Sequence, residues 1–423
     1  MLKKFFALLF ALLFVGAIPA KGAEAVYINT ETELAALSLR VMSGDSMEGV
    51  EVYLTSDLAL AEPFIPIGNA DTPFCGAFNG GGHTVKGLRV ERAEGYNGLF
   101  GCIVGGSVKG LSVEDAVILG GDYCGLIAGR IYCYGGYSSI VDCRATGTVE
   151  GACYVGGIAG LALSAAHGVY AEVLVSSCDF SGTVKGDIYV GGICGKAEAI
   201  STASRAESRV ENSESRGKAE ALGKYGTMVG GICGAIGAKS NGGSSIAAVN
   251  KCLSYLNSVA EKAAAGGICG AVGSEGYGAQ AWVDSSVAFG SVGALALAGG
   301  VAGRCEMTDR GVSAVKGSVA GGNVVGSDIY PVAKGEGVEN CFSSEDGDIV
   351  YPIEAEVPDY GRGDLNGDGK TDNLDAVLCL KYDSGLAIPG VAAKRSADVN
   401  GDGVADNLDA ALILRYDAGL NEL

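Results

Sequence analysis

Two acidic segments of twelve residues near the C-terminus carry the clearest chemical signal in the sequence. They read DLNGDGKTDNLD over residues 364–375 and DVNGDGVADNLD over residues 398–409. Each has oxygen-bearing side chains at positions 1, 3, 5, 9 and 12, a backbone carbonyl at position 7, and glycine at position 6, where a calcium loop turns sharply. Hard oxygen donors in this arrangement select calcium over softer metals. The two segments therefore predict two calcium-binding loops.

The predicted calcium ligands follow from these positions. In the first loop they are Asp364, Asn366, Asp368, the carbonyl of Lys370, Asp372 and Asp375. In the second loop they are Asp398, Asn400, Asp402, the carbonyl of Val404, Asp406 and Asp409. Two complete matches within one short region argue against the alternative, an acidic, turn-rich tail that binds no metal.

A short apolar helix is predicted after each loop, but none before the first. The preceding residues, VPDYGRG, cannot form the entering helix of an ordinary EF-hand, and position 12 is aspartate rather than the usual glutamate. The unit at 363–386 matches the unit at 397–420 at 16 of 24 positions. This duplicated unit closely resembles a type I dockerin, the module that attaches secreted plant-polysaccharide enzymes to a cellulosome scaffold by binding a cohesin domain.

The resemblance also implies which side chains contact the cohesin. They are Asn373, Leu374, Lys381 and Tyr382 in the first repeat, and Asn407, Leu408, Arg415 and Tyr416 in the second. Since both repeats present nearly the same surface, we expect that either can dock, with the module rotated by half a turn. The alternative is that Leu374 and Leu408 merely complete the module's own core. Loop position 8, usually a branched apolar residue in that family, is Thr371 or Ala405 here, so we expect a loose calcium-free form.

Glycine-rich segments recur through most of the remaining chain, which has 70 glycines in 423 residues. Their first shared glycine lies at residues 98, 125, 156, 191, 230, 266 and 299. The segments read NGLFG, CGLIAG, VGGIAG, VGGICG twice, AGGICG and AGGVAG. A second set of segments, such as IVDCRATGTV at 140–149, alternates with the first. Both sets look like short strands bounded by glycine turns, with no helices between them. An irregular repeat of this length predicts a solenoid, here a mainly β, right-handed parallel β-helix.

The repeat alignment also gives the cysteines a structural role. Cys194, Cys233 and Cys269 share one position with alanines, and Cys143 and Cys178 share another with serines. A column of Cys, Ala and Ser indicates small buried side chains, because free cysteine packs as a small hydrophobic residue. Stacked residues point the same way, which suits disulfide geometry poorly. We therefore expect mostly free, buried thiols.

These repeats resemble the GLUG-repeat family of bacterial surface and secreted proteins, over about residues 26–342. The sequence Thr30-Glu31-Thr32-Glu33 predicts a capping box that opens a helix extending to about Met42. We expect this helix to cover the end of the solenoid, where exposed strand edges would otherwise invite aggregation.

The solenoid sequence contains no recognisable catalytic constellation. A glycosidase needs two carboxylates that face one sugar bond. The candidate acids are scattered, and several fall where aspartate favours a turn: Asp122, Asp142, Asp179 and Asp284. The two histidines, His83 and His167, lie in no nucleophile motif. We expect a binding or adhesion module for carbohydrate or a cell surface; the alternatives are a polysaccharide hydrolase or lyase and an inert spacer.

Tyrosines recur near the glycine segments, among them Tyr123, Tyr154, Tyr189 and Tyr225. They could form an outer column that stacks on sugars. Alternatively, they could cover the ends of the core, as amphipathic aromatic residues often do.

Charge and targeting signals complete the prediction. The formal charge of −19 argues against nucleic acid or an anionic membrane as partner. Residues 1–25 combine a basic start, a short apolar run and an Ala-Glu-Ala cleavage site, which indicates a secretory signal peptide rather than a membrane anchor. Residues 343–361 are acidic and contain two prolines, as expected for a linker, and the dockerin-like module occupies 362–423. The sequence therefore predicts an extracellular protein attached to a cellulosome.

Overall fold

The structure is a computed structural model in which the chain forms two compact units, Met1–Val350 and Tyr351–Leu423. In the first unit it describes residues 25–343, apart from 94, 222, 224–226, 261–263, 309, 322, 331–332, 336–337 and 340–341. In the second it describes residues 362–365, 370–383, 396–397, 399–400 and 407–420. The predicted signal peptide lies outside these ranges except for its last residue, Ala25, and so does the predicted linker except for its first residue, Ser343.

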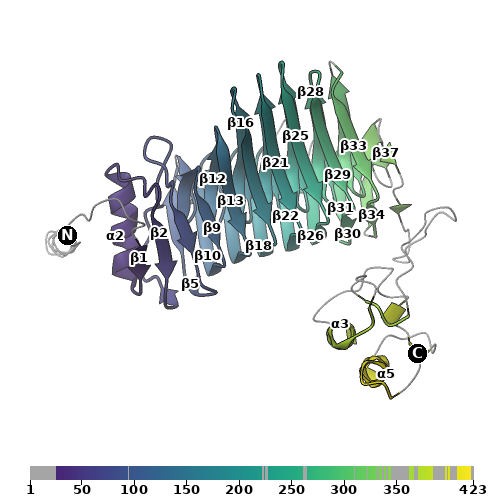
Figure 1. Cartoon of the computed structure of the whole chain (residues 1–423). Coiled ribbons are helices and arrows are strands. Elements are labelled where there is room, and N and C mark those ends of the chain that lie inside the picture. Colours follow the sequence, from purple (N-terminus) through teal and green to yellow (C-terminus); the bar gives the residue numbers. More distant parts are fainter. Residues whose placement is uncertain are drawn as a thin grey trace. The chain divides into compact units, whose positions relative to one another are not determined.

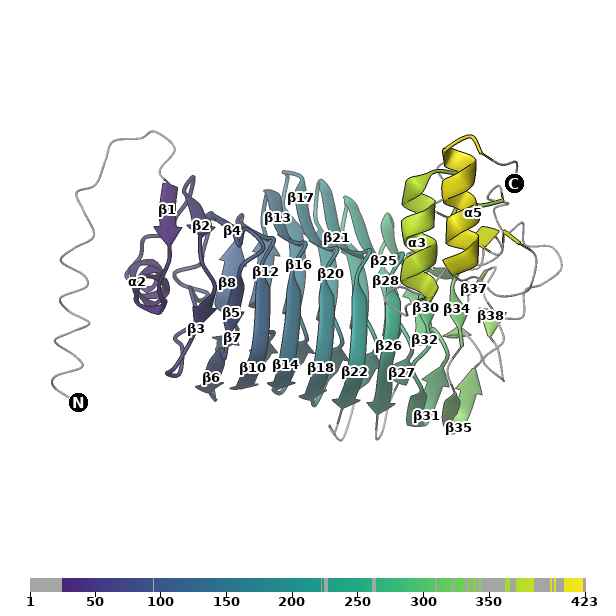
Figure 2. The same cartoon turned by 90° about the horizontal axis from the view of Figure 1, so that it is seen from below.

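The first unit is a parallel β-solenoid, as predicted (Figure 1). Its described strands form three sheets, and each strand pairs in parallel with its counterpart in the next coil. Figure 2 shows the same stack of strands from below. The right-handed sense of the coil stays a prediction.

The strand bounds show how regularly the coils repeat. Sheet A contains β1 (Ala25–Ile28), β2 (Glu51–Leu54), β4 (Ala77–Asn79), β9 (Ser107–Lys109), β13 (Gly136–Val141), β17 (Ala171–Ser176), β21 (Arg205–Glu211), β25 (Ser244–Asn250), β29 (Ala279–Asp284), β33 (Val312–Lys316) and β37 (Val338–Glu339). Sheet C contains β8 (Phe100–Val104), β12 (Ala128–Cys133), β16 (Ala159–Ala166), β20 (Cys194–Ser201), β24 (Cys233–Ser240), β28 (Cys269–Glu275), β32 (Ala302–Thr308) and β36 (Ala333–Gly335).

Sheet B receives two strands from most coils. Its strands are β3 (Leu58–Ala59), β5 (Thr84–Lys86), β6 (Arg89–Arg92), β7 (Tyr96–Asn97), β10 (Ser112–Gly120), β11 (Tyr123–Cys124), β14 (Arg144–Glu150), β15 (Tyr154–Gly156), β18 (Asp179–Gly186), β19 (Tyr189–Gly191), β22 (Glu214–Ala221), β23 (Met228–Gly230), β26 (Leu253–Ala260), β27 (Ala264–Gly266), β30 (Val287–Ala288), β31 (Val292–Gly299), β34 (Val319–Ala320), β35 (Val324–Tyr330) and β38 (Phe342–Ser343). One coil therefore runs, for example, from β13 through β14 and β15 to β16.

A left-handed residue makes the turn from sheet A to sheet B in successive coils. The backbone has a positive φ directly after the sheet A strand at Asp142, Ser177, Asn212, Lys251 and Ser285, with values between 48° and 54°. Asparagine and aspartate tolerate this conformation well, whereas lysine and serine adopt it less often. Asp142 therefore occupies a turn position, as its sequence context indicates.

The small-residue columns lie inside the solenoid. Cys194 is in register with Cys233, and Cys233 with Cys269, while alanine fills the same position in the neighbouring coils. Serine and cysteine alternate in the second column, where the Ser213 hydroxyl accepts a hydrogen bond from the Cys178 amide at 3.1 Å. The described cysteines are all free, and most are buried. The prediction of free, buried thiols is therefore confirmed for the described cysteines.

Helix α2 (Glu31–Met42) begins at the predicted capping box and ends where expected. The Glu33 amide donates to the Thr30 hydroxyl, and the Thr30 amide donates to the Glu33 carboxylate at 3.1 Å. Its apolar face buries Leu34, Leu37 and Val41 against the first coils, beside β1 and β2 (Figure 1). The helix thus covers the N-terminal end of the stack, as expected.

The second unit is a pair of short helices, α3 (Asn373–Asp383) and α5 (Asn407–Asp417), which pack against each other. Its own small core consists of Leu365, Ala376, Cys379, Ala397, Val399, Ala410 and Ile413. Each helix starts two residues before the last residue of its acidic loop, so each loop leads directly into a helix as the sequence predicts.

Candidate calcium-binding and docking module

The aspartate at loop position 12 is buried in both repeats and ties the start of the loop to the helix. Asp375 accepts hydrogen bonds from the amides of Leu365 and Asp372, at 2.8 and 2.9 Å. Asp409 accepts from the amides of Val399 and Asn400, also at 2.8 and 2.9 Å. The bond to the amide of loop position 2 is common to both repeats, whereas the second bond comes from position 9 in the first repeat and from position 3 in the second.

The other predicted ligands that the structure describes differ in burial. Asp364 is buried at the start of the first loop. The Asp372 carboxylate caps α3, because it accepts a hydrogen bond from the Leu374 amide at 2.8 Å. Lys370 and Asn400 are exposed. The other predicted ligands lie outside the described residues: Asn366, Asp368, Asp398, Asp402, Val404 and Asp406.

This donor set fits calcium. Asp364, Asp375 and Asp409 are buried carboxylates in a module whose core is very small. Burying a carboxylate is costly unless hydrogen bonds and a cation compensate it. Carboxylate, amide and carbonyl oxygens are the ligands that calcium prefers. The module thus supplies hard oxygen donors where a divalent cation would offset buried negative charge.

Two hydrogen bonds connect the repeats near the loops, one between backbone groups and one from a side chain. The Gly363 amide donates to the Ser396 carbonyl at 2.8 Å, and the Arg362 guanidinium donates to the Val399 carbonyl. The Thr371 hydroxyl, at loop position 8, donates to the Arg362 carbonyl at 3.1 Å. Thr371 therefore contributes a polar contact where an apolar bridging residue was expected from the resemblance.

The outer faces of both helices expose apolar side chains. Leu374 is 58% exposed and Leu408 is 60% exposed. Both leucines therefore lie outside the module's core, and the alternative that they complete it is wrong. Tyr416 is also exposed, as are Asn373, Asn407 and Arg415. Nothing is described for the side chains of Lys381 and Tyr382.

The structure adds apolar residues that the sequence comparison did not select. On α3, Val377 and Leu380 are 47% and 43% exposed, and on α5 Leu414 is 45% exposed. Spacings of three residues place Leu374, Val377 and Leu380 along one side of α3. An apolar strip of this kind typically marks a surface that binds another protein.

Comparison with known protein families agrees with this geometry. Residues 362–416 match the family described as the type I dockerin domain. The C-terminal module is a type I dockerin. Type I dockerins are calcium-binding modules, and the presence of one implies a cohesin partner in a cellulosome-like assembly.

Two further similarities were found. A segment of 102 residues is 34% identical to halomucin from Haloquadratum walsbyi, which amounts to 23% of this chain but only 1% of halomucin. A crystal structure of a candidate immunoglobulin A1 protease from Bacteroides ovatus is 17% identical, with a TM-score of 0.40, over 73% of this chain and 83% of that one. Neither similarity extends to function.

The candidate acids and histidines of the solenoid do not converge on one site. Asp142 occupies the left-handed turn, and Asp179 forms an ion pair with Arg144 at 3.3 Å. The His83 ring lies 3.2 Å from the Asp57 carboxylate, while His167 lies 3.0 Å from the Thr202 hydroxyl. Each histidine thus has a local partner from an adjacent coil.

The tyrosines form a continuous ladder on sheet B. Tyr96, Tyr123, Tyr154 and Tyr189 stack in register, with ring centroids 4.7, 4.9 and 5.2 Å apart. The next residue in the column is Met228, whereas Tyr225 lies outside the described residues. Because the rings stack on one another, each ring face inside the ladder is covered by the neighbouring ring. This arrangement favours a structural role over stacking on sugars.

Cations lie at both ends of this tyrosine ladder. The Arg130 guanidinium is 5.6 Å from the Tyr96 ring centroid and donates to the Tyr96 hydroxyl at 3.2 Å. The Lys196 ammonium lies 5.2 Å from the Tyr189 ring centroid. Burial raises the pKa of Tyr154 to about 12, so this phenol stays neutral at physiological pH.

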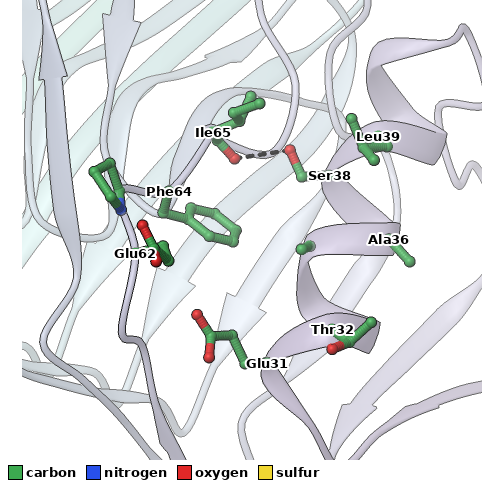
Figure 3. A pocket seen from close by; sticks show the side chains of 10 residues that line it. Glu31, Thr32, Ala36, Ser38, Leu39, Glu62, Phe64 and Ile65 are labelled. Carbon is green, nitrogen blue, oxygen red and sulfur yellow. Dashed lines mark hydrogen bonds between the residues drawn. The ribbon is translucent and has the colours of Figure 1, made fainter. Parts of the chain in front are cut away.

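A cavity of about 280 Å³ separates α2 from the segment at 62–65 (Figure 3). Phe64 points from that segment toward the helix, and Ala35 and Leu39 line the opposite wall. The Ser38 hydroxyl donates to the Ile65 carbonyl at 2.7 Å across the cavity. The walls are mainly apolar, although Glu31 and Glu62 also line the cavity, and the Ser38 hydroxyl that faces it is already bonded to a backbone carbonyl. The cavity is therefore a gap in the packing of the cap.

No helix in the described part of the chain combines the length and hydrophobicity that crossing a membrane would require.

Proposed function

We propose that this is a secreted component of a cellulosome-like assembly in which the dockerin attaches the solenoid to a cohesin-bearing scaffold. Residues 1–25 would direct export, residues 26–342 would form the cargo module and residues 343–361 would link it to the dockerin. The observation that supports docking most directly is the exposed apolar strip on α3, with its counterpart on α5.

Two calcium ions would hold the dockerin together. The first would be bound by Asp364, Asn366, Asp368, the Lys370 carbonyl, Asp372 and Asp375. The second would be bound by Asp398, Asn400, Asp402, the Val404 carbonyl, Asp406 and Asp409. When bound, the ions offset the buried negative charge of the loops, because metal binding and folding are coupled in small modules. Chelation should therefore unfold the dockerin and leave the solenoid intact.

Docking can be tested by changing one helix face at a time. Leu374→Ala with Lys381→Glu alters the first face, and Leu408→Ala with Arg415→Glu alters the second. Each pair alone should weaken cohesin binding less than tenfold, because the other face still docks. All four changes together should weaken it more than a hundredfold, since interface energy concentrates in a few contacts.

Calorimetry with a matching type I cohesin, in calcium, measures all three variants. The chelated wild-type protein is the control for complete loss of binding. If one pair alone abolishes binding, only a single face docks. If all four changes have no effect, the docking surface lies elsewhere on the module.

For the solenoid, we propose a binding or adhesion role toward carbohydrate or a cell surface. The supporting observation is the outer face of sheet C, which carries charged side chains such as Arg130 and Lys196. The full-length protein should be retained on at least one plant polysaccharide without altering it. Release of reducing ends or unsaturated sugars would instead favour the alternative, a polysaccharide hydrolase or lyase. If the protein neither binds nor cleaves any polysaccharide, the solenoid acts as a spacer.

A further inference from the structure

The outer face of sheet C loses its large side chains in two consecutive coils. One row across the sheet reads Lys196, Ala235, Ala271 and Arg304, and the next reads Glu198, Gly237, Gly273 and Glu306. The residues between these rows, such as Ile236 and Val272, belong to the core. Strands β24 and β28 therefore form the floor of a groove of about 330 Å³, with longer side chains on β20 and β32 as its walls.

The fold does not require glycine on this floor. At Gly147 and Gly182 an added Cβ atom would come within 2.1 and 1.9 Å of a carbonyl oxygen, so the close approach of adjacent coils demands glycine there. At Gly237 the nearest atom would be 3.7 Å away, and at Gly273 there is none within 4 Å. Neither residue has a positive φ. Glycine weakens a strand, so these two positions are kept small at a cost to the fold.

Ion pairs form the two walls. The Lys196 ammonium lies 2.9 Å from the Glu198 carboxylate, and these side chains are only 14% and 12% exposed. On the opposite wall the Arg304 guanidinium lies 3.1 Å from the Glu306 carboxylate. Lys239 and Glu275, 3.9 Å apart, extend the polar lining along the floor strands. The groove therefore presents three cations and three carboxylates, with a formal charge of zero in a chain of formal charge −19.

This lining matches a neutral, polyhydroxylated ligand. Partly buried ion pairs provide fixed hydrogen-bond donors and acceptors side by side, which is what vicinal hydroxyl groups need. A floor of Ala and Gly leaves room for a flat apolar ring face. The walls stand three strand spacings apart, roughly 14 Å between backbones. Because the three cations balance the three carboxylates, the groove offers no net attraction to a polyanion.

A peptide strand fits this groove less well. Strands β24 and β28 are paired with neighbours on both sides, so their backbone groups cannot bind an added strand. We infer that the groove on β24 and β28 is a binding site for a segment of a neutral polysaccharide chain. The inference rests on the carbohydrate-binding role proposed above and assigns that role to one site.

The test places two larger side chains on the floor of the groove, in the full-length, calcium-loaded protein. Gly237→Gln and Gly273→Gln are introduced together, because both positions have room for a side chain. Gly293→Gln is the matched control, since an added Cβ there also has no atom within 4 Å and Gly293 lies on β31 in sheet B. Cellohexaose, xylohexaose, mannohexaose and hexagalacturonate are titrated by calorimetry, and thermal unfolding confirms that each variant folds.

At least one neutral hexasaccharide should bind the wild type and the Gly293→Gln control equally, and bind the double variant at least tenfold more weakly. Binding that survives the double substitution would place the carbohydrate site elsewhere and overturn the groove, while leaving the proposed binding role intact. Binding of hexagalacturonate alone, lost in the double variant, would overturn the neutral ligand class. If the wild type binds no glycan in this set or among polysaccharides, the proposed role itself fails.

Discussion

Replacing Asp375 with alanine tests whether the buried position-12 carboxylate holds the dockerin together. The side chain is fully buried and accepts two backbone hydrogen bonds, from Leu365 and Asp372. A hydrogen bond to a charged group contributes about 1.5 to 3 kcal/mol, so the two together contribute about 3 to 6 kcal/mol. A module of this size has a total stability of about 3 to 8 kcal/mol. Asp375→Ala should therefore leave the module largely unfolded, even with calcium present.

Hydrogen exchange measured by mass spectrometry can follow this unfolding in the full-length protein. Peptides from α3 and α5 should lose protection in Asp375→Ala, while solenoid peptides keep theirs and act as an internal reference. Asp409→Ala should behave in the same way, because Asp409 is also buried and accepts two backbone hydrogen bonds. Asp417→Ala, at the exposed end of α5, is the control and should stay protected. Protection like that of the wild type in Asp375→Ala would refute the reasoning.

Four further predictions concern the solenoid. Burial raises the pKa of Cys102 to about 11 and of Cys124 to about 12, so these thiols should label slowly in the native protein and rapidly in denaturant without reductant; little labelling in denaturant would indicate disulfides instead. The pKa values of these thiols are higher in the folded than in the unfolded protein, so the neutral thiols contribute fully to the free energy of unfolding below about pH 8.5. That contribution is lost as pH rises toward 11, and the melting temperature should fall over that range. Gly182→Ala should lower the free energy of unfolding by about 2 to 4 kcal/mol, because the new Cβ would lie 1.9 Å from the Gly147 carbonyl oxygen. An unchanged denaturation midpoint would contradict this close approach of the two coils. Tyr154→Ala interrupts the tyrosine ladder and should cost about 3 kcal/mol in the same measurement without changing glycan binding, whereas lost binding would favour a sugar-stacking role.

The parts of the fold that were predictable are those coded by spacing along the chain. The glycine segments fix the coil period, and the columns at Cys194, Cys233 and Cys269 fall into register as the alignment predicts. The capping box at Thr30 likewise depends on residues three apart. Such patterns are local or strictly repeated, so they can be recognised in the sequence without knowing how the chain packs.

What could not be predicted depends on relative orientation. Val377 and Leu380 belong to the exposed strip on α3 only because the other side of the helix packs against α5. The tyrosine ladder, by contrast, follows a fixed spacing: Tyr96 and Met228 each lie two residues before a repeat glycine, whereas Tyr225 lies five residues before Gly230 and so falls outside the column.

The capped N-terminal end also bears on the order in which the solenoid assembles. Each coil contacts only its neighbours, so a new coil needs a formed strand edge on which to add its backbone hydrogen bonds. Helix α2 and β1 are the first described elements to be synthesised, and together they provide a closed starting surface. Coils can therefore be added one after another as the chain emerges, without waiting for distant residues. A substitution that prevents one coil from forming should then be more damaging near β2 than near β33, because every later coil loses its template.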